Sequence, residues 1–127
     1  MDFINTPNAP QPAGHYSQAV VHNGLVYVSG QLPIMPNSIK KEVGSIEEQT
    51  LQALQNLEQI LLASNSNISK VVKITVYISD ISLWGRVNEV YSQFFRDHKP
   101  ARAIVPTMEL HYGFQLEIEA IAATIGS

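Results

Sequence analysis

The chain has 127 residues, enough for one domain with its own core, and 45% of them are hydrophobic while only 15% are charged. The formal net charge is −3 and the eight Lys and Arg residues are scattered, with Lys40-Lys41 the only adjacent pair. This pattern disfavours nucleic acid as the main partner, because binding it needs a clustered basic surface. The absence of cysteine excludes disulfides, thiolate nucleophiles and thiolate metal ligands.

The sequence shows no targeting or membrane segment. Residues 1–5 contain no basic region followed by a long apolar run, and no apolar stretch approaches the ~20 residues that a bilayer requires. We find no internal repeat or linker either. We therefore expect one domain over residues 1–127, in the cytoplasm, with no membrane contact. The low charged content leaves neutral surface that favours an oligomer.

The first elements in chain order are an arm and a hairpin. Residues 1–16 are rich in Pro, Asn and Ala, which predicts an irregular arm. Two runs typical of strands then flank Asn23-Gly24, and this dipeptide supplies the positive φ angles of a tight hairpin turn. The second strand is predicted to end at residues 30–33, and a loop with two prolines is predicted over residues 33–44.

A helix is predicted after this loop. Ser45 and Glu48 have the spacing of a capping box, in which each side chain binds the backbone N–H of the other residue. A stripe of helical period follows, formed by Leu51, Leu54, Leu57 and Leu61. The polar run at residues 65–67 is predicted to end the helix.

A buried strand and a second helix come next. Residues 71–78 are β-branched and mostly apolar, as in a central strand. Asp80 or Ser82 can cap the second helix, whose predicted apolar face consists of Trp84, Val87, Tyr91 and Phe94. Residues 97–100 are predicted to end it, since the residue before a proline leaves the helical region.

Two more strands are predicted, at about residues 101–109 and 115–125, joined by a loop that contains Tyr112-Gly113. The element order is then β-β-α-β-α-β-β, with an antiparallel hairpin at each end. We expect an α+β fold, in which one mixed β-sheet carries both helices packed on one face. The other face would hold uncovered apolar residues, and self-association is the simplest way to cover them.

Few residues point to chemistry. The histidines have no pair at metal-ligand spacing, and they are His15, His22, His98 and His111. No G-x-S-x-G nucleophile motif and no glycine-rich phosphate loop is present. These residues therefore give no support to a local metal site or to a phosphate-binding loop, and they leave a metal site built from distant residues open.

Two charged positions in apolar strands stand out. Arg102 lies in the opening turn of a predicted strand, and its guanidinium suits a carboxylate. Glu117 and Glu119 lie two residues apart and so point to the same side of the last strand, where one of them can act as a general base. The residues alone leave two interpretations open: a binding site, or a role without chemistry in which Arg102 and Glu117 are either edge charges or an ion pair with each other.

Seven stretches, in the same order, resemble motifs of the Rid family of enamine and imine deaminases, also called YjgF or endoribonuclease L-PSP-like. The resemblance covers essentially the whole chain. The stretches are Thr6-Pro7-Asn8-Ala9-Pro10, Gly14-His15-Tyr16-Ser17-Gln18-Ala19, Val28-Ser29-Gly30-Gln31-Leu32-Pro33, Glu47-Glu48-Gln49-Thr50, Val87-Asn88-Glu89-Val90-Tyr91, Pro100-Ala101-Arg102 and Glu117-Ile118-Glu119-Ala120-Ile121-Ala122.

The resemblance implies a chorismate-mutase-like fold and a homotrimer whose sheets face inward, with a ligand cleft between each pair of subunits. It also implies hydrolysis of short 2-imino acids, the tautomers of 2-aminoacrylate-type enamines, to 2-keto acids and ammonia. Pyridoxal-phosphate enzymes release these reactive compounds. The implied partner is a small imino or keto acid, and no metal or cofactor is needed.

The resemblance also assigns roles. Arg102 matches the arginine that grips the substrate carboxylate, and Glu117 matches the glutamate that positions the attacking water. The substrate-binding residues would be Tyr16, which flanks the substrate, Ser29 and Gly30, which line the pocket, Asn88, which borders the cleft, and Ile104.

The chain departs from the family pattern in three places. Relatives often have Gly-Pro-Tyr where this chain has Gly14-His15-Tyr16. Ile104 stands where many deaminating members have a polar residue, at a position that contributes partly through its backbone, so it would make the pocket more apolar. The loop over residues 109–113 also differs, and its His111 and Tyr112 would either approach the pocket mouth or lie in a surface loop.

Two other functions stay open. Ile104 and the altered loop are the features that favour a non-catalytic protein holding a keto or amino acid in the same cleft. A ribonuclease or translation inhibitor is a label attached to some family members. The negative charge and the lack of a basic stripe argue against it.

Overall fold

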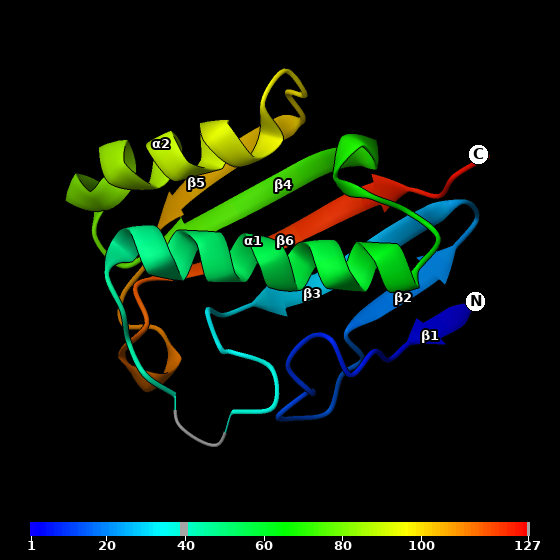
Figure 1. Ribbon diagram of the computed structural model, residues 1–127, viewed down its shortest axis with the longest axis horizontal. Coiled ribbons are helices and arrows are strands. Elements are labelled where there is room, and N and C mark those ends of the chain that lie inside the picture. The colour runs from blue at the N-terminus through cyan, green and yellow to red at the C-terminus, as the bar shows by residue number, and fades with distance from the viewer. Residues whose placement is uncertain (39–40, 127) are drawn as a thin grey trace.

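The computed structural model describes residues 1–38 and 41–126; residues 39–40 of the predicted loop over 33–44 lie outside the described residues. One six-stranded sheet has the order β1-β2-β3-β6-β4-β5 (Figure 1). Its strands are β1 (Asp2–Ile4), β2 (Ala19–His22), β3 (Leu25–Gln31), β4 (Val71–Ile78), β5 (Ala101–Pro106) and β6 (Leu116–Ala123). The helices are α1 (Ile46–Ala63) and α2 (Trp84–Phe95), with short 3₁₀ turns η1 (Ile68–Lys70), η2 (Ile81–Leu83) and η3 (His111–Gly113).

The hairpin predicted at Asn23-Gly24 is confirmed. β2 and β3 pair antiparallel up to the turn, and the φ angles of Asn23 and Gly24 are 51° and 78°. The prediction of an irregular arm over residues 1–16 is wrong at its start, because residues 2–4 form the edge strand β1, paired with β2. Three residues are too few to show an alternating pattern, so only the neighbouring edge of β2 makes them a strand.

The capping box at the start of α1 is confirmed: both reciprocal hydrogen bonds between Ser45 and Glu48 are present. The predicted apolar stripe is wrong at Leu51, which is 41% exposed. Polar residues take part in the buried face instead. Asn56 donates to the carbonyls of the strand-to-helix loop, and Gln49 exchanges hydrogen bonds with Gln115, just before β6. The buried face of α1 thus binds the loop after β3 and the residue before β6, in addition to packing on the sheet.

The second helix begins after the residues that were predicted to cap it. Asp80 accepts from the N–H of Ser82 and so caps η2, while α2 itself starts at Trp84 without a side-chain cap. Its buried residues are Val87, Tyr91 and Phe95. The predicted face named Phe94 instead of Phe95; Phe94 is only partly buried and packs edge-on against Phe95.

The antiparallel hairpin predicted for the two C-terminal strands is wrong. β5 pairs parallel with β4 at the edge of the sheet, and β6 lies between β3 and β4, antiparallel to both. The unit β4-α2-β5 is a crossover connection, which places successive strands parallel. β6 alternates buried and half-buried residues along its whole length, which suits a central position. The strands are also shorter than predicted, ending at residues 106 and 123.

Both helices lie side by side on one face of the sheet, as predicted (Figure 1). No helix among residues 1–38 and 41–126 covers the other face, which is called the open face below. Phe3 and Tyr27 lie on it and are 69% and 43% exposed. In the part of the chain that the structure describes, no helix is long and apolar enough to cross a membrane.

Candidate functional site

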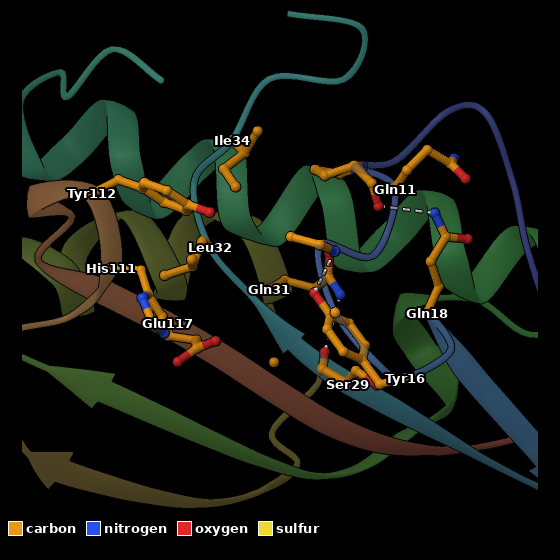
Figure 2. A pocket seen from close by; sticks show the side chains of 14 residues that line it. Gln11, Tyr16, Gln18, Ser29, Gln31, Leu32, Ile34, His111, Tyr112 and Glu117 are labelled. Carbon is orange, nitrogen blue, oxygen red and sulfur yellow. Dashed lines mark hydrogen bonds between the residues drawn. The ribbon is translucent and has the colours of Figure 1, made fainter. Parts of the chain in front are cut away.

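A cavity of about 420 Å³ opens between the N-terminal arm, the end of β3, η3 and the start of β6 (Figure 2). Several residues that the resemblance assigned to the site line it together, namely Tyr16, Ser29, Gly30 and Glu117. Its apolar wall includes Pro10, Ala13, Leu32 and Ile34. We call it the Glu117 cavity.

Glu117 lies directly over Gly30. A Cβ atom built on Gly30 would be 2.6 Å from Oε2 of Glu117, closer than real Cβ contacts come, so glycine at position 30 gives the carboxylate its space. Burial raises the pKa of Glu117, the charge of His111 lowers it and that of Glu119 raises it. A carboxyl with a raised pKa in a cavity suits a general base.

The N-terminal wall of the cavity is held by the buried side chain of Gln18. Its Oε1 accepts from the N–H of Thr6 at 2.7 Å, and its Nε2 donates to the carbonyls of Thr6 and Pro10, both at 3.0 Å. A single side chain thus anchors residues 6–10 of the arm, beyond the pairing of β1 with β2.

Ser29 and Tyr16 are placed by the same segment. The hydroxyl of Ser29 donates to the carbonyl of Ser17 at 2.6 Å, and its N–H donates to the carbonyl of Gln18 at 3.0 Å. The hydroxyl of Tyr16 accepts from the N–H of Ala13 at 3.3 Å. The Ser29 hydroxyl proton is therefore engaged with the backbone, while the Tyr16 ring remains half exposed in the cavity lining.

His111 and Tyr112 both line the Glu117 cavity, so the loop over residues 109–113 approaches the pocket. Left-handed backbone at Tyr112 and Gly113, with φ of 63° and 79°, turns η3 inward. The ammonium of Lys41 makes a cation–π contact with the ring of Tyr112, and its Nζ is 4.8 Å from the ring centre. The sequence signal for this loop was its departure from the family pattern.

Arg102 lies elsewhere, in a second cavity of about 460 Å³ between α2 and the start of β5. Its Nη1 donates to Oδ1 of Asn88 at 2.9 Å. Its guanidinium carbon is 4.7 Å from the centre of a ring of Trp84 and 4.9 Å from that of Tyr91. An arginine held by an amide and two aromatic rings has few rotamers left. Sequence reasoning placed Trp84 in the apolar face of the helix and missed this contact.

The cationic side chains of Arg96, Lys99 and Arg102 line this second cavity, together with His98. The hydroxyl of Tyr91 is buried and has no hydrogen-bond partner among the described residues. Burial raises the pKa of Tyr91, and the positive charge of Arg102 opposes that rise. The arrangement suits a small anion.

Strand register puts Arg102 and Glu117 on opposite faces of the sheet. Arg102 pairs with Ile74, a core residue on the helix-covered face, whereas Glu117 pairs with Tyr77, on the open face. The alternative of an ion pair between Arg102 and Glu117 is therefore excluded within one chain. Ile104 pairs with Val76, packs against the core and lines neither cavity.

The described residues contain no cluster of three or more histidine, aspartate or glutamate side chains with the geometry to hold a metal ion.

A family model described as Endoribonuclease L-PSP matches residues 6–124. A rat protein named 2-iminobutanoate/2-iminopropanoate deaminase is 44% identical over 119 residues, which cover 94% of this chain and 87% of the rat protein. The crystal structure of YyfA, a Rid family protein from Yersinia pestis, has a TM-score of 0.93 at 40% identity and covers 97% and 98% of the two chains. E. coli TdcF, solved with bound serine, has a TM-score of 0.91 at 34% identity and the same coverage.

Proposed function

Because the chain belongs to the Rid (endoribonuclease L-PSP) family and has its chorismate-mutase-like fold, we propose that it hydrolyses short 2-imino acids to 2-keto acids and ammonia. The substrates are 2-iminopropanoate and 2-iminobutanoate. The working form is a homotrimer in the cytoplasm, where pyridoxal-phosphate enzymes release these compounds, and no metal or cofactor takes part.

The observation that carries this proposal is the division of the site residues into two halves. Arg102 and Asn88 form a cationic half at the edge strand β5, and Tyr16, Ser29, Gly30 and Glu117 form a half with a general base. Neither half can hold and hydrolyse an imino acid alone. The open face supplies a surface on which a second chain can dock, and β5 borders it. A cleft between two chains, with Arg102 from one and Glu117 from the other, completes the site.

In this cleft, Arg102 grips the substrate carboxylate through its guanidinium. Asn88 and the rings of Trp84 and Tyr91 hold the guanidinium in place, so little entropy is lost when the substrate binds. Fixing one end of the substrate against an aligned water removes much of the entropic barrier to attack.

Glu117 then acts as the base. The substrate reacts as its iminium, C=NH₂⁺. The water oxygen attacks the iminium carbon while a water proton passes to the Glu117 carboxylate, and the C=N electron pair moves to nitrogen, which gives a neutral carbinolamine. The Glu117 carboxyl then donates that proton to the amino nitrogen. The C–N bond breaks, ammonia leaves with the bonding electron pair, and the hydroxyl becomes the carbonyl of the keto acid as its proton passes to the Glu117 carboxylate and from there to solvent.

A second candidate is a non-catalytic protein that holds an amino or keto acid in the same cleft. The crystal structure of TdcF with bound serine favours it, since a relative holds an intact amino acid.

One assay separates the two. A dehydratase generates 2-aminoacrylate or 2-iminobutanoate in place, and the release of keto acid is followed with and without the protein. We expect acceleration by the wild type and none by Arg102→Ala. Binding of a keto acid without acceleration would instead support the non-catalytic protein.

A further inference from the structure

We infer that His111 is a positioning residue for Glu117: its imidazolium holds the Glu117 carboxyl in the ionised form that takes the water proton. The inference rests on the proposed function and deepens it. It concerns a residue outside the motifs through which the chain resembles its family.

The geometry brings the two side chains together within one chain. His111 comes from η3 and Glu117 from the start of β6, and both line the same cavity. Figure 2 shows the imidazole beside the carboxylate, and the two groups interact electrostatically. Phe114, buried at the end of η3, anchors the turn that carries His111. The position of His111 is therefore set by the fold, although its side chain is exposed.

Glu117 needs such a cation. Burial and the neighbouring Glu119 both favour the protonated carboxyl, and the charge of His111 opposes them. The other titratable groups that line the cavity or face it from β4 and β6 are Tyr16, Tyr77, Tyr112 and Glu119. The hydroxyl of Tyr77 donates a hydrogen bond to Glu119, whose negative charge raises the pKa of Glu117. The ammonium of Lys41 lies over the ring of Tyr112.

The exposure of His111 matters for its role. An imidazole takes up a proton near neutral pH, above the range in which carboxyls titrate. A charge on a solvent-exposed imidazole costs little desolvation free energy. A charge on the half-buried Glu117 carboxylate costs more. We therefore assign the positive charge to the exposed His111 and the two proton transfers to Glu117.

The direct test is a titration of the Glu117 carboxyl, followed by ¹³C NMR, in the wild type and in His111→Gln, His111→Lys and His22→Gln. We expect the midpoint to move to higher pH in His111→Gln and to stay near the wild-type value in His111→Lys, which keeps a cation. His22→Gln removes an exposed histidine at the far hairpin and is expected to change nothing. An unchanged midpoint in His111→Gln overturns the inference, as does an equal shift in His111→Lys.

The kinetic test separates this inference from the proposed function. In the imine assay, the acid limb of the kcat/KM profile should move to higher pH in His111→Gln, with a smaller loss at the alkaline plateau. Hydrolysis with an unmoved acid limb contradicts the role of His111 alone. If the wild type does not hydrolyse the imine but the NMR midpoint still shifts in His111→Gln, the proposed function is contradicted. The electrostatic interaction between His111 and Glu117 is supported in that case. Thermal unfolding curves check that each variant is folded.

Discussion

The side chains of Arg102 and Glu117 leave the same sheet on opposite faces, since Arg102 is in register with the core residue Ile74 and Glu117 with Tyr77 of the open face. Two strands of one sheet cannot bring such side chains together. The proposed chemistry therefore depends on two chains.

This dependence predicts complementation between inactive variants. Arg102→Ala and Glu117→Gln should each lose imine hydrolysis. Unfolding and refolding them together at equal amounts should restore activity, because roughly a quarter of the intersubunit sites of a randomly mixed trimer would hold both native residues. Refolding each variant alone is the control. If the mixture remains as inactive as its components, the shared site is wrong.

The guanidinium of Arg102 is predicted to be irreplaceable by an ammonium. Arg102→Lys keeps the charge but loses the fork that binds both Asn88 and a carboxylate, and it fits poorly between the rings of Trp84 and Tyr91. We expect kcat/KM to fall by an amount that corresponds to a loss of about 2–3 kcal/mol in transition-state stabilisation, on the scale of a lost charge-assisted hydrogen bond. Arg96→Lys in the same cavity is the matched control and should have little effect on kcat/KM.

The close approach of Glu117 to Gly30 predicts that one methyl group disturbs the base. In Gly30→Ala the new Cβ would displace the Glu117 carboxylate, 2.6 Å away, but not the backbone. We expect a large loss of kcat and a small change in Tm. The control is Gly85→Ala, whose Cβ meets nothing within 4 Å. Because Gly85 lies in α2, its replacement should stabilise the protein, by up to about 1 kcal/mol. Full activity in Gly30→Ala would argue against Glu117 as the base.

Glu119 should affect the pH profile with a defined sign. Its negative charge raises the pKa of Glu117, so Glu119→Gln should lower that pKa while keeping an acceptor for Tyr77. A base with a lower pKa is ionised at lower pH, and the acid limb of kcat/KM should move downward. Steady-state kinetics across pH measure this shift, and Glu109→Gln on the exposed loop is the control. Movement to higher pH would contradict the electrostatic account.

The anchor of the N-terminal arm predicts a stability effect. Gln18→Leu keeps the volume but removes four hydrogen bonds, to Thr6 N, Thr6 O, Ala9 O and Pro10 O, and leaves the buried N–H of Thr6 without its partner. We expect a loss of about 2–3 kcal/mol in the free energy of unfolding. Urea denaturation measures it. Gln11→Leu, which removes only one exposed side chain bound to Thr6 O, should cost much less.

Sequence reasoning named the candidate site residues without their arrangement. The motif resemblance named both halves of the site, yet it contained no information on which faces Arg102 and Glu117 take. Trp84 was missed as a support of Arg102, because an aromatic residue on a helix face has the same pattern whether it packs on the core or on a cation. The pocket-lining place of His111 and Tyr112 depends on left-handed backbone at residues 112–113, for which Tyr112 carries no signal.

The sequence by itself determined the local elements. The turn at Asn23-Gly24 and the capping box at Ser45 and Glu48 were predicted correctly, because neighbouring residues set the φ angles of the turn and the hydrogen bonds of the cap. Only the tertiary structure decided that β6 lies between β3 and β4 and that the site residues divide between two faces. Strand order depends on which buried surfaces fit together across long stretches of chain, and no short pattern encodes that competition.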